Sequence, residues 1–335
     1  MGMLLTRRML EDLRGSDALV IMHWDADAIS TVAMVKKYLG LNTTLYTPPI
    51  GVYKVIYDDV PRDGYSLILD VDFGVSTEEL ERLGEWMGLD VYVIDHHRRM
   101  DSDKIFIADY MSNGRELPSA STTFLSLYNL EPDIFSAIGL AGDIHHRLEN
   151  SVFRYFIDSV SKEYGLTWRD VVKVANLLDT NYISKDREGV YRAVDILMEH
   201  ESRPEGLLEF EEWLGRWDEI NRSIASEMER AEDLGEVLYL DVESPYLIAS
   251  KVGRALSRRY PDKIVFITNR DMVDGYSQVY VRCMECDLTR LINMLVEMGF
   301  SAGGRRDVVG VIVDRKDYDR VVEHVKRFLG VDDVL

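Results

Sequence analysis

Short apolar strands alternate with helical stretches in the N-terminal part of the chain. Three segments have the composition of buried strands: ALVIMH (18–23), SLILDV (66–71) and VYVID (91–95). A helical stretch follows the first of them up to about Gly40, and another covers STEELERLGEWMG (76–88). This order predicts a parallel, doubly wound sheet and the α/β fold class. We further expect helices at 1–14, 119–142 and 151–178.

The same alternation begins again after a long charged helical stretch at 205–233. Strands are predicted at 237–242, 263–268 and 277–283, helices at 248–260 and 287–298, and GGRRDVVGVIV (303–313) follows them. The length of 335 residues also favours two domains, at roughly 150 residues each. We therefore predict a first domain at 1–200, a helical linker at 201–235 and a smaller α/β domain at 236–335.

Acidic and histidine side chains follow the ends of the predicted strands. His23, Asp25 and Asp27 follow the first strand, Asp72 follows the second, Asp95, His96 and His97 follow the third, and Asp143 ends the apolar run FSAIGLAG. In open parallel α/β sheets, ligands bind outside the carboxyl ends of the strands. Crowded carboxylates repel one another, and divalent metals relieve that repulsion. Carboxylate with imidazole suits Mn, Zn or Fe, and paired metals about 3.5–4 Å apart can activate a water and clamp a phosphoryl group.

Each of these short motifs is weak evidence by itself. A loop with two acids and a histidine occurs often by chance, and a histidine after a strand is usually a polar cap. The ordered combination HxDxD, Asp-x-Gly, Asp-His-His and Gly-Asp is far less frequent by chance. The combination therefore favours a metal centre over a set of solvated strand ends.

The order of these motifs resembles the DHH phosphoesterase superfamily, which includes RecJ-type exonucleases, oligoribonucleases, cyclic-dinucleotide phosphodiesterases and family II pyrophosphatases. Four segments are similar to its motifs in order: HWDADAIS (23–30) in the short archaeal RecJ-like form, Asp72-Phe73-Gly74, Asp95-His96-His97 and Gly142-Asp143. PSASTTF (118–124) matches the stretch between the third and fourth motifs. The C-terminal half resembles the DHH-associated domain, so the resemblance spans about 18–313.

The resemblance implies a centre that holds two Mn ions, with Mg as a substitute. One ion would be held by His23, Asp25 and Asp72, and the other by Asp27, Asp72, His96 and Asp143. The metals would activate a water as the nucleophile, so no protein nucleophile is needed. The catalytic residues would be His97, which faces the scissile phosphate and stabilises developing charge, and Asp95, which orients an adjacent imidazole.

The loop that would contact substrate departs from the family pattern. Where the family commonly has Gly-Gly-His, this chain has Gly303, Gly304 and Arg305. The glycines still permit a close backbone approach to a phosphate, and Arg305 with Arg306 can form a phosphate fork. The substrate is therefore expected to carry phosphate.

Two further positions are candidate substrate contacts, each with an alternative interpretation. Arg282 resembles the substrate arginine of the family, but an arginine beside a strand end otherwise forms a surface ion pair. His145 and His146 follow Asp143 closely. Either they line the site, and we include His146 among the substrate residues, or they are solvated residues at a helix start.

Composition limits the partners. The net charge of −20 lacks the basic face of proteins that coat long nucleic acid, so either contact with nucleic acid is local or the substrate is small and phosphorylated. With only Cys283 and Cys286, a disulfide framework is excluded, and we expect ordinary thiols and a cytoplasmic protein. No apolar run reaches the roughly 18 residues of a membrane span, so no membrane partner is expected.

Three functions fit these observations. The first is a Mn-dependent two-metal phosphodiesterase that cuts single-stranded DNA, RNA or short oligonucleotides from an end, as a RecJ-like exonuclease does. The second is a small-molecule phosphatase or phosphodiesterase that acts on a cyclic dinucleotide, a nucleoside bisphosphate or pyrophosphate. The third is a replication factor that binds the GINS complex and has weak or no nuclease activity. Every expected ligand type is present, which favours an enzyme, and the motif form suggests an archaeal source.

Overall fold

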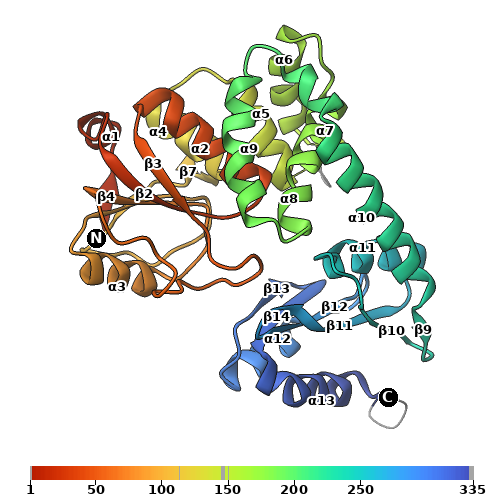
Figure 1. Ribbon diagram of the computed structural model, residues 1–335. Coiled ribbons are helices and arrows are strands. Elements are labelled where there is room, and N and C mark those ends of the chain that lie inside the picture. The colour runs from red at the N-terminus through yellow and green to blue at the C-terminus, as the bar shows by residue number, and fades with distance from the viewer. Residues whose placement is uncertain (1, 113, 145–147, 150, 332–335) are drawn as a thin grey trace. The chain divides into compact units, whose positions relative to one another are not determined.

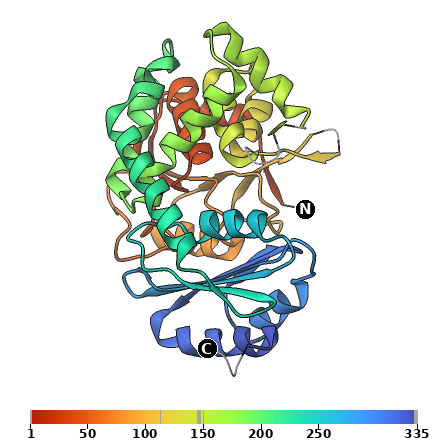
Figure 2. The ribbon, with the colours of Figure 1, turned by 90° about the vertical axis from the view of Figure 1, so that its right-hand side faces the viewer.

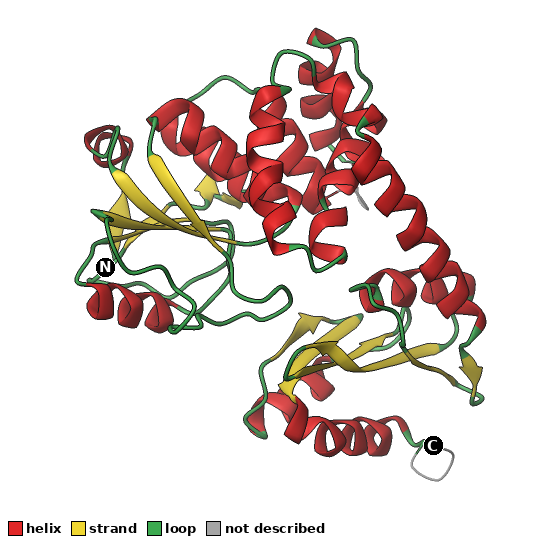
Figure 3. Ribbon diagram, in the orientation of Figure 1, coloured by secondary structure: helices red, strands yellow, loops and turns green. Residues whose placement is uncertain are grey.

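The computed structural model describes residues 2–112, 114–144, 148–149 and 151–331. The chain divides into two compact units, Met1–Tyr182 with Asp186–Gly215, and Ile183–Lys185 with Arg216–Leu335. The division falls within the long helix α10 (Glu211–Glu229), and each unit contains a six-stranded sheet (Figures 1 and 3).

The chain before α10 supplies the elements of the first unit. Its strands are β1 (Met3–Leu5), β2 (Asp17–Met22), β3 (Asn42–Tyr46), β4 (Leu67–Val71), β5 (Val91–Ile94), β6 (Phe106–Ala108), β7 (Met111–Ser112) and β8 (Arg115–Glu116). Its helices are α1 (Arg7–Asp12), α2 (Ala26–Leu39), α3 (Thr77–Met87), α4 (Ala120–Tyr128), α5 (Ile134–Ile144), α6 (Phe153–Glu163), α7 (Trp168–Leu178), α8 (Thr180–Ile183), α9 (Arg187–Glu199) and the 3-10 helix η2 (Pro204–Glu209).

The main sheet of the first unit is entirely parallel, with the strand order β1-β6-β5-β4-β2-β3. Helices α2 and α4 lie on one face of this sheet and α3 on the other (Figure 1). The apolar runs of β2, β4 and β5 are almost wholly buried because helices cover both faces. The predicted α/β class and parallel sheet are thus confirmed. From β2 the chain runs outward to β3 and then returns to β4 on the other side of β2, which makes the β2–β4 pair the switch point where such sheets bind ligands.

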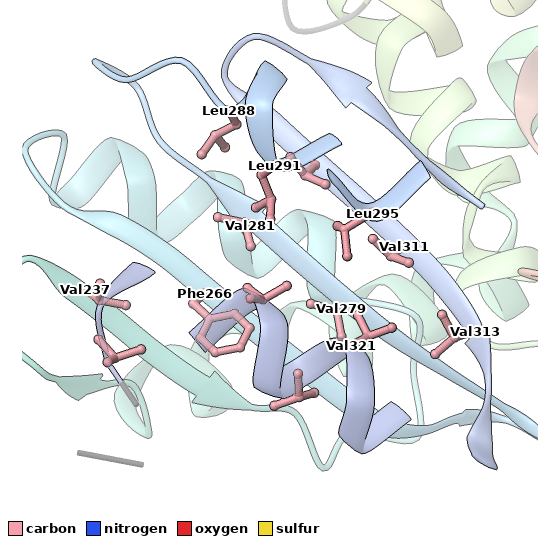
Figure 4. Close-up of a cluster of buried hydrophobic side chains, with 14 of the residues drawn as sticks. Val237, Phe266, Val279, Val281, Leu288, Leu291, Leu295, Val311, Val313 and Val321 are labelled. Carbon is pink, nitrogen blue, oxygen red and sulfur yellow. The ribbon is translucent and has the colours of Figure 1, made fainter. Parts of the chain in front are cut away.

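The second unit has a mixed sheet of the order β13-β14-β12-β11-β10-β9. Its elements are β9 (Glu232–Asp233), β10 (Val237–Asp241), α11 (Ala249–Arg259), β11 (Ile264–Val273), β12 (Tyr276–Arg282), α12 (Thr289–Glu297), β13 (Ala302–Arg305), β14 (Val308–Asp314), the 3-10 helix η3 (Arg315–Asp317) and α13 (Tyr318–Leu329). Helix α11 lies on one face of the sheet, and α12 and α13 lie on the other (Figure 2). The core on the α12 and α13 side is an apolar cluster that includes Phe266, Val281, Leu291 and Val321 (Figure 4).

Several predicted helices are corrected by the structure. Residues 119–142 form two helices, α4 and α5, because Asn129 ends α4 with a φ of 55° and Pro132 follows it. Residues 151–178 are likewise two helices, α6 and α7, separated by a turn in which Gly165 has a φ of 70°. The stretch 205–233 is broken at Phe210, between η2 and α10.

The N-terminal segment also differs from the prediction. Residues 1–14 were expected to form one helix, but the described part contains the short strand β1 followed by α1. Strand β1 adds to the edge of the sheet by pairing with β6, which is a contact distant in sequence. Among the described residues, no helix has both the length and the apolar character that crossing a membrane requires.

Candidate metal centre

Strands β2, β4 and β5 deliver their acidic and histidine side chains to one edge of the sheet. Met22 pairs with Val71, and Val71 pairs with Ile94, so the three strands end level with one another. The ladder continues for one more residue, since His23 N–H donates to Val71 O at 3.1 Å and Asp72 N–H donates to Ile94 O at 3.0 Å. The segments that follow the three strands therefore begin side by side.

Three groups of side chains at this edge have donor atoms within 4.8 Å of one another: His23, Asp25 and Asp72; Asp27, His96 and Asp143; and Asp72, Asp95, His96 and His97. The first two groups are joined through His96, whose Nε2 lies 3.2 Å from Asp143 Oδ2 and 3.4 Å from Asp72 Oδ1. The structure thus brings together all six residues that sequence motifs predict as metal ligands. Asp72 stands between the two donor sets.

Asp72 has an unusual backbone that aims its carboxylate. Its φ is 56°, in the left-handed region that few non-glycine residues adopt, although Asp and Asn tolerate it better than most. The residue is 3% exposed, and its N–H bond to Ile94 O fixes this conformation at the strand end. Backbone strain of this kind is held by the surrounding structure and is commonly found at functional sites.

Asp27 is wholly buried and is held by the N-terminus of α4. Its Oδ2 accepts from Ala120 N–H at 2.6 Å, and its Oδ1 accepts from Ser121 N–H at 3.1 Å. A helix N-terminus stabilises a carboxylate because its amides and its dipole both favour negative charge. Each oxygen keeps a lone pair for a further ligand.

Asp25 caps the start of α2 and also contacts His23. As the N-cap, its Oδ1 accepts from Ala28 N–H at 3.1 Å, while its Oδ2 lies 2.9 Å from His23 Nδ1. Asp179 supports the same turn, since its Oδ1 accepts from Ala26 N–H at 3.0 Å. The capping bond fixes the carboxylate of Asp25 so that its second oxygen points toward the donor cluster.

The electrostatics of this edge fit bound cations. Burial, and then repulsion from Asp27 and Asp25, raise the pKa values of both Asp72 and Asp143 well above their ordinary value. Burial and Asp25 raise the pKa of Asp27 to about 6. In addition, Asp72 Oδ1 and Asp143 Oδ2 are buried without a hydrogen-bond partner among the described residues. Carboxylates and imidazoles that crowd around such oxygens match the ligand set of divalent metals.

Asp95 and His97 form a hydrogen-bonded pair within the third of these groups of donor side chains. Asp95 Oδ1 lies 2.8 Å from His97 Nδ1, and it also accepts from the backbone N–H groups of His96 and His97 at 2.7 and 3.0 Å. These bonds, and the charge of Arg99, outweigh the effect of burial and lower the pKa of Asp95. The hydrogen bond to Asp95 raises the pKa of His97, whose side chain is 55% exposed. His97 is therefore a fixed imidazole that can donate toward a bound anion.

No protein-family profile matches the chain, and no curated protein matches its sequence. Solved structures do match it. RecJ from Thermus thermophilus in complex with Mn²⁺ aligns with a TM-score of 0.66 at 16% identity, over 97% of this chain and 54% of that one. The chain has the fold of RecJ and of DHH-domain proteins. It spans about half the length of that RecJ.

Two further proteins have the same DHH fold. CDC45 from Entamoeba histolytica aligns with a TM-score of 0.58 at 11% identity, over 97% of this chain and 99% of that one. A pGpG-specific phosphodiesterase from Vibrio cholerae aligns with a TM-score of 0.54 at 13% identity, over 94% of this chain and 99% of that one. The resemblance inferred from the motifs is confirmed at the level of the fold.

Five of the six predicted substrate residues belong to the second unit and lie on or next to the β13–β14 hairpin. Gly303, Gly304 and Arg305 lie on β13, and Gly304 has a φ of 151°. Arg282 ends β12 and forms an ion pair with Asp307 at 2.7 Å, as the alternative interpretation of this residue expects. Arg306 lies 3.3 Å from Asp287. His145 and His146 lie outside the described residues.

The cysteines beside this hairpin correct an expectation. Cys283 and Cys286 are bonded to each other as a disulfide and are not the ordinary thiols expected from their number. The bond closes the segment that follows Arg282, and Cys283 N–H donates to Asp307 O at 3.0 Å. The disulfide therefore closes a short loop directly after Arg282.

Sequence reasoning missed the residues that support the centre from behind. The buried Arg99 donates to Asp95 Oδ2 at 2.6 Å and to Asp70 Oδ2 at 2.8 Å. Burial, despite Arg99, raises the pKa of Asp70 to about 7. The available signal was an acid inside the apolar strand LILDV, because a buried acid calls for a buried partner.

Proposed function

We propose that this protein is a metal-dependent phosphodiesterase that hydrolyses single-stranded nucleic acid or short oligonucleotides from an end. The observation that carries the proposal is the position of Asp72 between two sets of carboxylate and imidazole donors at the switch point of the sheet. Both the donor types and the RecJ neighbour in complex with Mn²⁺ support a Mn²⁺ centre, and a second RecJ structure contains Mg²⁺.

His23, Asp25 and Asp72 would hold one metal, and Asp27, Asp72, His96 and Asp143 the other. When bound, such metals supply Lewis-acid polarisation of the phosphoryl oxygens and activation of a water. The chain contributes the positions of the ligands. Helix α4 fixes Asp27, the N-cap bond of α2 fixes Asp25, and the left-handed backbone fixes Asp72.

His97 would act on the substrate itself. Its Nδ1 is engaged by Asp95 and its side chain is exposed, so the other nitrogen, Nε2, would contact a bound anion. A proton at Nε2 stabilises charge that develops on the phosphoryl or leaving-group oxygen. Asp95 favours the charged imidazole and holds its orientation, and Arg99 holds Asp95.

The arginines of the second unit would bind the phosphates of the substrate. Arg305 is exposed on β13. Arg306 pairs with Asp287, and Arg282 pairs with Asp307 and also donates to the hydroxyl of Tyr280 at 3.4 Å. A phosphate can compete for such side chains, because a bidentate arginine–phosphate pair is stronger than a surface ion pair. His146 remains a predicted contact.

A small-molecule phosphodiesterase is the second candidate. The net charge of −20 favours a short substrate, and the pGpG-specific enzyme of Vibrio cholerae has the same fold. A replication factor is the third candidate, since CDC45 also has the fold, and association with GINS stays a prediction. The donor sets support an enzyme, because a scaffold has no need of crowded buried carboxylates.

The substrate can be tested by metal-dependent cleavage. The protein is incubated with Mn²⁺ or Mg²⁺ and with a labelled dinucleotide, a single-stranded 20-mer of DNA or RNA, and a cyclic dinucleotide. We expect Mn²⁺-dependent cleavage of single-stranded substrates, with products released from one end. Preference for the dinucleotides over the 20-mers would favour the second candidate. Absence of cleavage of every substrate would contradict an enzyme, and co-purification with GINS subunits would then support the third candidate.

A further inference from the structure

Tyr53 stands exposed at the rim of the candidate metal centre. It is 52% exposed, and its hydroxyl lies 3.4 Å from Nε2 of His23. The rings of His23 and Tyr53 are stacked, with centroids 5.8 Å apart and an angle of 30° between their planes. An aromatic ring is thus placed next to a predicted metal ligand, and the functions described so far do not use it.

The ring of Tyr53 packs against a buried aromatic residue, which in turn packs against a second one. Trp24 is 3% exposed and meets Tyr53 edge-on, with ring centroids 5.1 Å apart. Phe73 is wholly buried and meets Trp24 in the same way at 6.3 Å. Since Trp24 follows His23 and Phe73 follows Asp72, the residues next to two predicted ligands build the support of Tyr53.

The loop that carries Tyr53 is anchored on both sides of it. This loop joins β3 to β4, and Val52 and Val55 on either side of Tyr53 are buried, with exposures of 2% and 4%. Tyr46 also ties the loop to the sheet, because its hydroxyl accepts from Ile56 N–H at 3.2 Å. Tyr53 is therefore exposed on an anchored loop, and its apolar ring lies in solvent although Val52 and Val55 are buried.

We propose that Tyr53 is the stacking platform for the nucleobase adjacent to the phosphate at the metal centre. The inference rests on the proposed function and adds to it the contact that binds the nucleobase of the substrate at the metal centre. A ring beside a phosphate site suits a base, since every base offers a flat face to an aromatic side chain. One such stack changes affinity by about 5- to 150-fold.

The other role open to Tyr53 is to orient His23 through its hydroxyl. Two substitutions distinguish these roles, because one removes the hydroxyl and the other removes the ring. Tyr53→Phe keeps the ring and deletes the hydroxyl, whereas Tyr53→Leu deletes the ring. Tyr57→Leu is the matched control, because Tyr57 lies in the same loop but packs edge-on against Trp86, with centroids 5.1 Å apart.

The test is equilibrium binding, which does not depend on turnover. A phosphorothioate-linked dinucleotide and a twin without bases are titrated into the Mn²⁺-treated full chain by calorimetry. We expect the parent to bind the base-bearing ligand at least about 5-fold more tightly than its twin. Tyr53→Leu should abolish that preference, whereas Tyr53→Phe and Tyr57→Leu should each retain it.

Three results would overturn the inference: a parent that does not prefer the base-bearing ligand, a Tyr53→Leu variant that keeps the preference, or a Tyr53→Phe variant that loses it. The last result would assign Tyr53 to His23. If the preference for the base depends on Tyr53 but no substrate is cleaved in the metal-dependent assay, the proposed catalysis is contradicted and the stacking platform is supported. If substrate is cleaved but the parent shows no preference for the base-bearing ligand, the platform is contradicted and the catalysis is supported.

Discussion

Gly139 leaves the space that the carboxylate of Asp27 occupies. A Cβ atom at Gly139 would lie 2.6 Å from Asp27 Oδ1 and would also collide with Ser121 Oγ. Asp27 and Ser121 both belong to the contact in which α4 holds Asp27. The carboxylate of Asp27, a predicted metal ligand, can therefore take this position only because residue 139 of α5 has no side chain.

We predict that Gly139→Ala weakens Mn²⁺ binding by about 10- to 100-fold, the usual effect of disturbing the residues around metal ligands. Calorimetric titration with Mn²⁺ measures it. Gly215→Ala is the control, since Gly215 is also helical but a Cβ there meets nothing within 4 Å. Equal Mn²⁺ affinity of both variants would show that the position of Asp27 does not matter for metal binding.

Arg99 is predicted to be essential for folding stability. Its side chain is 4% exposed and neutralises Asp70 and Asp95, which are at 0% and 1%. Arg99→Met leaves two buried acids without their partner and should lower the free energy of unfolding by about 3–5 kcal/mol, as measured by urea denaturation. Arg7→Met, which breaks the exposed pair of Arg7 with Glu11, should cost less than about 1 kcal/mol. If the two variants lose similar amounts of unfolding free energy, burial of the ion pair does not determine how much it contributes to stability.

Metal affinity should rise with pH. Burial and repulsion raise the pKa of Asp27 to about 6 and those of Asp72 and Asp143 well above their ordinary value when no cation is bound. Protons therefore compete with the cation below these pKa values, and binding releases protons. Mn²⁺ titrations at about pH 5 and about pH 8 should give the tighter binding at the higher pH. A pH-independent affinity would mean that the carboxylates are not ligands.

Gly304 should be irreplaceable in the hairpin of the second unit, whereas Gly303 should not. At Gly304 the φ of 151° is open mainly to glycine, and a Cβ would collide with the backbone of Val308. At Gly303 a Cβ meets nothing within 4 Å. Gly304→Ala is therefore expected to destabilise the fold by more than about 1 kcal/mol, and Gly303→Ala by less, in thermal unfolding. The opposite order would contradict this hairpin geometry.

The candidate ligands could be predicted from the sequence because they follow strand ends, where topology alone brings them together. His23, Asp72 and His96 need only the parallel order of β2, β4 and β5 to become neighbours. Local pattern also sufficed for β2, β4 and β5, which are continuous apolar runs, but not for the more polar strand β3.

The supporting residues depend on tertiary contacts that no local pattern encodes. Gly139 and Arg99 act on partners far away in the chain, namely Asp27 and Asp70. Tyr53 likewise meets His23 from a loop 30 residues further along the chain. The strands β1 and β6 escaped prediction for a related reason, since three residues carry too little periodicity and the pairing partner lies about a hundred residues away.

The number of Mn²⁺ ions bound per chain tests the binuclear centre most directly. Equilibrium dialysis followed by metal analysis should find two ions in the parent. Asp72→Asn removes the shared charge and keeps a residue that tolerates the left-handed backbone, so it should bind fewer ions with the fold intact. Fewer than two ions in the parent, or two in a folded Asp72→Asn variant, would contradict the account.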